Sequence, residues 1–113
     1  MKTISAIVIA KNEEKMIKEC LASLSFCNEI IVIDNGSKDA TLEIAEKTGA
    51  RVFDFRTDDF FKLRNYGLEK AHGEWILYVD ADERVPLRLK EEIESKILEE
   101  SSFDAYKIKR KNY

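Results

Sequence analysis

The feature that most constrains the fold is an apolar run that ends on two aspartates one residue apart, WILYVDADE at residues 75–83. A strand over residues 75–79 has no polar face, so it has to lie inside a sheet that is covered on both sides. Asp80 and Asp82 then emerge at its carboxyl end. Ligands of open α/β sheets bind outside the carboxyl ends of the strands, and Mg²⁺ prefers carboxylate and phosphate oxygens. The run therefore predicts a buried strand leading into a site for metal and phosphate.

Aspartates are also common in turns and at helix N-termini, so this pair alone is equally compatible with a structural role. The rest of the chain has to decide. Four apolar, β-branched runs recur, separated by stretches with helical spacing. The expected strands are residues 4–10, 30–33, 52–55 and 75–79. This alternation predicts an α/β fold with a mostly parallel sheet between two layers of helices.

Two helices are expected between the first three strands. The first has Asn12 as its expected N-cap, and it buries apolar residues on one side, namely Met16, Ile17, Cys20, Leu21 and Leu24. The second follows Ser37 and Asp39, which are both suitable N-caps, and Gly49 is its expected stop.

Two more helices are expected further along the chain. The third is predicted over about residues 61–72, ending at Gly73. The fourth follows Pro86, a good first-turn residue. Its four-residue spacing predicts a buried stripe of Leu89, Ile93 and Ile97.

The size and composition fit one domain over residues 1–113, since 44% of the 113 residues are hydrophobic. Cys20 and Cys27 are the only cysteines and form no metal-binding or redox motif, so we expect neither a disulfide nor a zinc site in a reduced, cytoplasmic chain. No apolar stretch approaches the roughly 20 residues that cross a bilayer, so we expect any membrane contact to be peripheral.

The last residues combine positive charge with alternating polar and apolar positions. Residues 104–113 hold four cations and one aspartate, whereas the whole chain has a net charge of −3. Such a segment can meet phosphates or anionic lipid, but the alternation favours a strand over residues 103–111 with one wet face. This strand looks unfinished. We therefore expect a truncated chain whose exposed edge can pair with a second copy.

Polar side chains follow three of the predicted strands at their carboxyl ends. Asn12 and Glu13 follow the first strand, Asp34 follows the second, and Asp80 and Asp82 follow the fourth. Parallel strands bring these positions to one edge of the sheet. Four crowded carboxylates repel one another unless a cation or hydrogen-bond donors compensate, which favours a functional role for the set.

The chemistry of these side chains suggests a division of tasks. Glu13 and Asp34 are suited to accepting hydrogen bonds from ribose hydroxyls or a base N–H. Asp82, with Asp80 beside it, is suited to Mg²⁺ or Mn²⁺, because such ions take one or two protein carboxylates and complete their shell with phosphate and water. Arg64 on the third helix is either a donor to a diphosphate or a partner in a surface ion pair.

Four segments in this order resemble the inverting family 2 glycosyltransferases of the GT-A fold, which use nucleotide-diphosphate sugars. They are residues 4–14 (ISAIVIAKNEE), 31–41 (IVIDNGSKDAT), 64–68 with 73–75 (RNYGL and GEW), and 80–82 (DAD, like the DxD motif). The run DERV at residues 82–85 is also similar to the subgroup that acts on lipopolysaccharide core and related envelope glycans, usually with UDP-sugars.

The resemblance implies a Rossmann-like GT-A domain with its donor and metal site in this chain. The implied nucleotide-binding residues are Asn12, Glu13, Asp34, Arg64 and Asp80, and the implied metal ligands are Asp80 and Asp82. The sequence departs from the usual pattern at Lys11, Asn35 and Ala40, which leaves the base preference open.

The same resemblance implies an enzyme that transfers a sugar, with inversion, to a cell-envelope glycan or a lipid-linked acceptor. The general base is expected beyond Tyr113, in an acceptor-binding part that this chain lacks. No nucleic-acid partner is expected, and the reaction is expected in the cytoplasm at the inner face of the cytoplasmic membrane. Three alternatives remain at this point: a haloacid-dehalogenase-like phosphatase, a receiver-like signalling domain, and a nucleotide-binding module without transfer chemistry.

Overall fold

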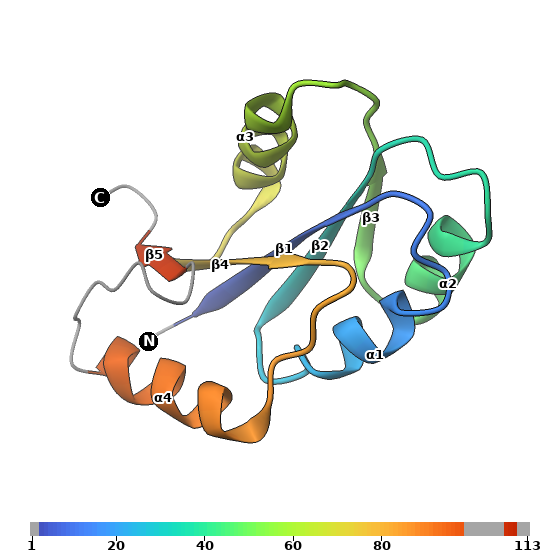
Figure 1. Ribbon diagram of the computed structural model, residues 1–113. Coiled ribbons are helices and arrows are strands. Elements are labelled where there is room, and N and C mark those ends of the chain that lie inside the picture. The colour runs from blue at the N-terminus through green and yellow to red at the C-terminus, as the bar shows by residue number, and fades with distance from the viewer. Residues whose placement is uncertain (1–2, 99–107, 111–113) are drawn as a thin grey trace.

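A single five-stranded sheet lies between helices on both faces in the computed structural model, which describes residues 3–98 and 108–110. The strands are β1 (Ile4–Ala10), β2 (Glu29–Asp34), β3 (Arg51–Asp54), β4 (Trp75–Asp80) and β5 (Ile108–Arg110). The helices are α1 (Ile17–Ala22), α2 (Thr41–Lys47), α3 (Phe60–Lys70) and α4 (Leu87–Leu98). Figure 1 shows α3 above the sheet, α1 and α4 below it, and α2 beside β3, and Ala45 of α2 packs into the same cluster as α1 and α4.

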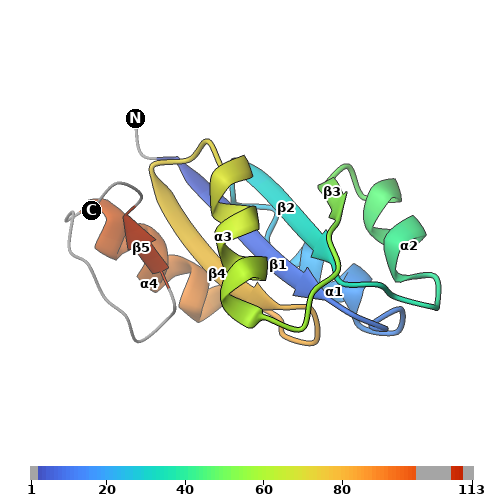
Figure 2. The same ribbon diagram turned by 90° about the horizontal axis from the view of Figure 1, so that it is seen from above.

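The strand order is β3-β2-β1-β4-β5, with β1 in the middle as Figure 2 shows from above. The pairs β1–β2, β1–β4 and β2–β3 are parallel, and β5 runs antiparallel to β4. The predicted mostly parallel α/β sheet with helices on both faces is therefore confirmed. Because four strands run the same way, their carboxyl ends share one edge of the sheet.

The core has two parts, one on each face of the sheet, because side chains alternate along a strand. Trp75, Leu77 and Val79 of β4 pack into the cluster with α1, α2 and α4, whereas Ile76 and Tyr78 face α3. Both faces of β4 are covered, as its unbroken apolar sequence predicts.

The start of α1 differs from the prediction. Met16 is the N-cap, and no side chain caps the helix. Asn12 lies four residues earlier with a φ of +54°, in the left-handed region, and its Oδ1 accepts the backbone N–H of Lys38. The prediction of Asn12 as a helix cap is wrong because a neighbouring loop uses its amide oxygen.

The start of α2 also differs. Its N-cap is Ala40, which offers no side-chain acceptor, and Ser37 points back to Asp34 instead. Asp39 accepts the Thr41 N–H at 3.0 Å, so it supports the first turn from the position before the cap. The predicted stop is confirmed in position, because Gly49 follows the helix end with a φ of +90°.

The third helix starts and ends earlier than predicted. Asp59 caps α3 by accepting the N–H groups of Phe61 and Lys62, and the helix ends in an extended Ala71 rather than at Gly73. Gly73 has another role, because a Cβ on it would lie 2.5 Å from Ser5 Oγ. The glycine allows close approach of two backbones and does not stop the helix.

The fourth helix agrees with its predicted pattern. Ile93 and Ile97 are buried and Leu89 is partly buried against the same cluster. Pro86 immediately precedes α4, and its carbonyl accepts the Lys90 N–H. Of the predicted strand at residues 103–111, only Ile108–Arg110 falls within the described residues, where it forms β5. The predicted wet face and the basic tail lie outside them.

Two predicted absences can be compared with the described residues. Cys20 and Cys27 are free thiols, and Cys20 is buried. Among residues 3–98 and 108–110, no helix has the length and apolarity that a membrane span requires.

Candidate functional site

The carboxyl edge of the sheet brings the predicted acidic residues to one side of the molecule. In the strand register, Ala10 of β1 pairs with Asp34 of β2, and Ile9 of β1 pairs with Asp80 of β4. Asp34 and Asp80 therefore flank the end of β1. Neighbouring strands lie about 4.8 Å apart, so the two backbones are separated by roughly 10 Å.

The surroundings of Cys20 identify which acids gather on the β4 side of this edge. Burial, together with the nearby carboxylates of Glu83, Asp82, Asp80 and Glu13, raises the pKa of the Cys20 thiol to about 12. The thiol also contacts the Asp80 carbonyl oxygen at 3.6 Å. Glu13, Asp80 and Asp82 thus share one acidic region.

Asp34 is buried, with 3% of its surface exposed, and its orientation is fixed by one neighbour. Ser37 Oγ donates to Asp34 Oδ1 at 2.6 Å, and the Ser37 N–H donates to Oδ2 at 3.2 Å. A carboxylate accepts up to about four hydrogen bonds, so lone pairs remain for a ligand. The fixed orientation suits recognition of one particular donor.

The loop after β1 is joined to the loop after β2 by hydrogen bonds in both directions. The Asn12 N–H donates to Ser37 Oγ at 2.8 Å, and the Lys38 N–H donates to Asn12 Oδ1 at 2.7 Å. The Glu13 N–H donates to Thr41 Oγ1 at 2.8 Å. Asn12 therefore shapes the loop with its oxygen and leaves its Nδ2 group for a ligand.

The Glu13 side chain is differently placed. It is half-buried, and its carboxylate has neither a hydrogen bond nor an ion pair within residues 3–98 and 108–110. Glu13 and Asn12 also line a surface hollow of about 370 Å³ beside the β1–α1 loop, together with Glu14, Lys15, Met16 and Asp39. The unengaged carboxylate faces an accessible part of this edge.

A tight turn after β4 places Asp82. The Glu83 N–H donates to the Asp80 carbonyl at 2.9 Å, and the Asp80 N–H donates to Glu83 Oε1 at 2.8 Å. Asp82 lies inside this doubly closed turn with an exposed side chain. Sequence reasoning missed this role of Glu83. The signal was the Asp-x-x-Glu spacing, which resembles the reciprocal capping of a helix N-terminus.

Two further contacts attach the segment after this turn to α1. Arg84 forms an ion pair with Glu19 at 2.8 Å, and the Val85 N–H donates to Ser23 Oγ at 2.9 Å. Both members of the ion pair are exposed, so the pair itself contributes little to stability. Their shared effect is to hold the turn against the helix.

Arg64 lies on α3, which packs on the face of the sheet opposite to α1. Its guanidinium carbon is 4.5 Å from the ring centre of Tyr78 and 4.9 Å from that of Phe60. Its Nε is buried without a hydrogen-bond partner. Within the described part of the chain Arg64 forms no ion pair, so the surface ion pair considered from the sequence is not formed there.

The carboxylates at this edge can hold a divalent metal only if a bound substrate supplies further ligands. Within residues 3–98 and 108–110, no group of three His, Cys, Asp or Glu side chains could enclose an ion. The exposed Asp82, with Asp80 two residues before it, offers the one or two carboxylates that Mg²⁺ or Mn²⁺ takes when substrate phosphates and water supply the rest. The donor set therefore fits a metal that binds together with its substrate.

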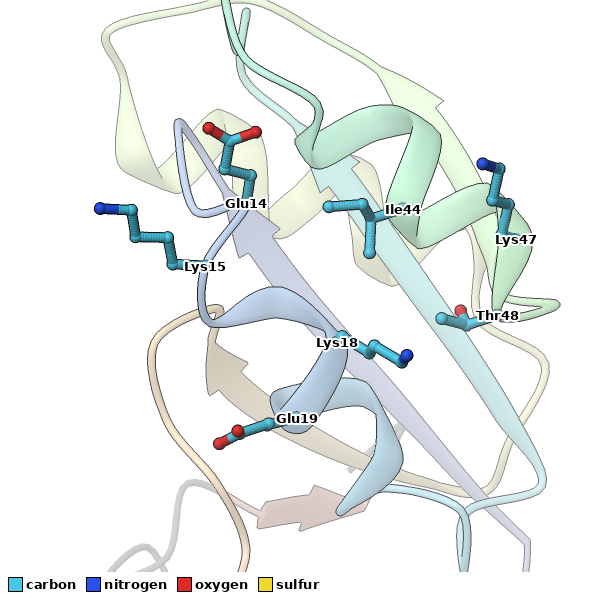
Figure 3. A pocket seen from close by; sticks show the side chains of 7 residues that line it. All are labelled: Glu14, Lys15, Lys18, Glu19, Ile44, Lys47 and Thr48. Atoms are coloured by element: carbon cyan, nitrogen blue, oxygen red, sulfur yellow. The ribbon is translucent and has the colours of Figure 1, made fainter.

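A larger groove of about 560 Å³ lies between α1 and α2, and it shares Glu14 and Lys15 with the hollow beside Glu13. Figure 3 shows its lining side chains, which are Glu14, Lys15, Lys18, Glu19, Ile44, Lys47 and Thr48. Asp34, Asp80 and Asp82 are absent from it. The groove therefore extends from the Glu13 side of the site and does not include the strand-end aspartates.

The chain matches a family model and longer proteins. The model for Glycosyl transferase family 2 matches residues 5–112. The lipopolysaccharide core biosynthesis glycosyltransferase LpsC of Rhizobium meliloti is 26% identical over 97% of this chain and 43% of its own length. A TPR repeat-containing protein of Synechococcus elongatus is 37% identical, and an uncharacterized glycosyltransferase of Rickettsia typhi is 36% identical. Both are longer, because the chain spans 25% and 32% of their lengths.

Solved structures share the fold. TarS of S. aureus, in complex with UDP-GlcNAc, has a TM-score of 0.73 and 32% identity over 88% of this chain and 32% of that one. Glucosyl-3-phosphoglycerate synthase of Mycobacterium tuberculosis, in complex with Mn²⁺, UDP and glucosyl-3-phosphoglycerate, has a TM-score of 0.63 and 27% identity over 74% and 36%. One neighbour thus holds a nucleotide sugar, and the other a nucleotide with a metal.

Proposed function

The chain belongs to glycosyltransferase family 2, with its Rossmann-like GT-A fold, and from this premise we propose that it binds a UDP-sugar and a divalent metal for transfer of the sugar with inversion. The observation that carries the proposal is the position of Asp34 and Asp80 on either side of the end of β1, with Asp82 in the turn that follows. A nucleoside diphosphate has its two chemical ends at a comparable separation.

The nucleoside is assigned to the Asp34 side of the edge. Asp34 is buried and oriented by Ser37, so it can accept a hydrogen bond from a base N–H or a ribose hydroxyl. Glu13, on the β1–α1 loop, has an unengaged carboxylate, and Asn12 on the same loop offers its Nδ2 group. The two kinds of group together supply acceptors and a donor for uridine.

The diphosphate is assigned to the Asp80 side. Asp82 and Asp80 would hold Mg²⁺ or Mn²⁺, and Arg64 would donate to phosphate oxygens. When bound, the metal supplies charge neutralisation for the departing diphosphate. The residues of this chain bind and orient the leaving group, and leaving-group stabilisation is the part of catalysis that they would provide.

Inverting transfer also requires a base for the acceptor hydroxyl. Glu83 is engaged by the Asp80 N–H, and Asp104 lies outside the described residues. We therefore assign the base to a part of the enzyme outside residues 1–113, together with acceptor binding. The greater length of the relatives supports this division.

The acceptor is proposed to be a cell-envelope glycan or a lipid-linked sugar. The relative LpsC carries lipopolysaccharide core biosynthesis in its name, and it covers nearly the whole chain. Such an acceptor would place the reaction in the cytoplasm, at the inner face of the cytoplasmic membrane, with peripheral contact. Pairing of two chains through an exposed edge strand stays a prediction.

One alternative is a nucleotide-binding module that lacks transfer chemistry. Such a module would bind UDP-sugar in the full-length protein without turnover. The phosphatase and the receiver-like domain are set aside by the family membership. In addition, Asp54 at the end of β3 would have to be the phosphoacceptor of a receiver-like domain, and it forms an ion pair with Arg56 at 3.2 Å.

The test is calorimetric titration of the chain with UDP in Mn²⁺ and in EDTA, comparing the wild type with Asp82→Asn. Asp58→Asn, at an exposed position between β3 and α3, is the matched control. We expect UDP binding that depends on the metal. In Asp82→Asn it should weaken at least about tenfold, because loss of a charged metal ligand costs about 1.4 kcal/mol or more. In the control it should stay unchanged. Failure of the folded chain to bind UDP, GDP and dTDP would overturn the proposal.

A further inference from the structure

The guanidinium of Arg64 lies over two aromatic rings. Its central carbon lies 4.5 Å from the ring centre of Tyr78 on β4 and 4.9 Å from that of Phe60, one turn earlier on α3. Phe60 and Arg64 are four residues apart, so they share a face of the helix. Contact with both rings restricts the orientations that the guanidinium can adopt.

The stack leaves the cation without an anion. Arg64 Nε is buried and donates to nothing, and Arg64 pairs with no carboxylate in the described part of the chain. Burial of an unsatisfied charged donor opposes folding unless another group compensates. The rings compensate part of the charge through their negative faces, but they accept no hydrogen bond along the guanidinium edge.

The position of the stack indicates which anion completes it. Tyr78 and Asp80 are two residues apart on β4, so their side chains project from the same face of the sheet, roughly 7 Å apart along the strand. The α3 helix begins at the carboxyl edge and runs away from it, which puts Arg64 in its half nearer the edge. The stack therefore borders the acidic turn at the metal side of the site.

We propose that Phe60 and Tyr78 are positioning residues that hold the Arg64 guanidinium as a preorganised receptor for the diphosphate of the donor. The inference rests on the proposed function, because the diphosphate belongs to the assigned nucleotide. It adds two aromatic residues that touch no substrate themselves. Their effect is to present a planar, bidentate donor that is already desolvated and oriented before the ligand arrives.

A purely structural role makes a different prediction. If the stack only joins α3 to β4, removal of a ring lowers stability and leaves nucleotide affinity unchanged. The chain offers a matched control in Tyr66 of α3, which stacks on Phe55 with ring centres 4.4 Å apart and does not contact Arg64. Tyr66→Leu removes the same kind of ring from the same layer.

The first measurement is the affinity for UDP in Mg²⁺, with uridine as the ligand without phosphate. We expect Tyr78→Leu and Phe60→Leu to weaken UDP binding about tenfold, the upper part of the range for a desolvated cation–π contact. Uridine binding should stay within about twofold. Tyr78→Phe, which keeps the ring, should restore UDP binding, and Tyr66→Leu should leave it unchanged. Phe60 is 47% exposed, so its substitution is compatible with folding even if Tyr78→Leu is not.

The second measurement is the NMR signal of the Arg64 Nε–H group in the ¹⁵N-labelled chain, assigned by its loss in Arg64→Lys. Sodium pyrophosphate and UDP should both shift it, and uridine should not. A shift with pyrophosphate but no binding of UDP would support the receptor and overturn the proposed function. UDP binding that requires Asp34 but is unaffected by Tyr78→Leu and Phe60→Leu would overturn the receptor alone. No shift with either ligand overturns the receptor, and it overturns the proposed function as well if calorimetry also detects no UDP binding.

Discussion

Glu83 and Asp80 close the same turn twice, because each donates its backbone N–H to an oxygen of the other, at 2.9 and 2.8 Å. We predict that Glu83→Ala opens this turn and weakens Mn²⁺-dependent UDP binding by about tenfold, since one hydrogen bond to a charged acceptor contributes about 1.5 kcal/mol or more. Calorimetry measures the effect.

The matched variant is Glu83→Gln, whose amide oxygen can still accept the Asp80 N–H. It should bind nearly as well as the wild type, because the turn requires the acceptor and not the charge. Equal loss in both variants would point to the charge of Glu83 as the important property.

A second prediction concerns pH and the opposite edge of the sheet. Burial raises the pKa of Glu29, but hydrogen bonds from the His72 backbone, Ser5, Arg51 and the His72 ring outweigh it and lower the pKa to about 2. Because the pKa of Glu29 is lower in the folded protein than its usual value of 4.5, the ionised carboxylate stabilises the fold at pH values above 4.5. This contribution, on the order of 2 kcal/mol, is lost as pH falls from about 4.5 towards 2.

Urea unfolding at a series of pH values between 7 and 2 tests this prediction. Glu29→Gln should be less stable than the wild type at pH 7, and its stability should change less below pH 4.5. Parallel pH profiles for the two proteins would show that other carboxylates dominate acid unfolding.

The third prediction separates two glycines. A Cβ on Gly73 would meet Ser5 Oγ at 2.5 Å and the Ser5 backbone nitrogen at 2.7 Å, whereas a Cβ on Gly49 would meet nothing within 4 Å. Gly73→Ala should destabilise the fold by about 3 kcal/mol through overpacking. Gly49→Ala should cost only about 1 kcal/mol, from its φ of +90°. Chemical unfolding measures the free energy of unfolding of both variants. Equal losses of stability would contradict the close approach of Gly73 to Ser5.

The fourth prediction concerns Ser37, whose hydroxyl donates to Asp34 and accepts from the Asn12 N–H. Ser37→Ala should lower UDP affinity by about tenfold, because Asp34 loses its orientation, and should lower stability by about 1 kcal/mol. Ser25→Ala, at an exposed position, serves as the control. Binding and unfolding are measured on the same preparations. Unchanged UDP affinity would mean that Asp34 is held correctly without the hydroxyl.

Strongly patterned elements could be predicted from the sequence, and tertiary contacts could not. The two-sided burial of β4 follows from its five successive apolar residues, and the gathering of Asp34, Asp80 and Asp82 follows from parallel strand directions. The caps were less predictable. Asn12 has the right chemistry for a cap, but its amide oxygen bonds to a loop that is 26 residues away in sequence.

Gly73 was misjudged, and the aromatic neighbours of Arg64 were not foreseen, for a related reason. Gly73 looks like a helix stop in sequence, and only the fold shows that β1 passes next to it. Arg64 carries no sequence signal that distinguishes a carboxylate partner from two aromatic ones. Tyr78 belongs to a different element, and its alignment with Arg64 depends on how α3 packs on the sheet.

The pairing of β1 with both β2 and β4 also bears on how proteins of this architecture can diverge. The spacing between Asp34 and Asp80 is fixed by main-chain hydrogen bonds across three strands, which do not depend on which side chains the strands carry. Insertions or substitutions in the loops can therefore change the chosen base or sugar over evolutionary time. The span offered to the ligand would be inherited unchanged.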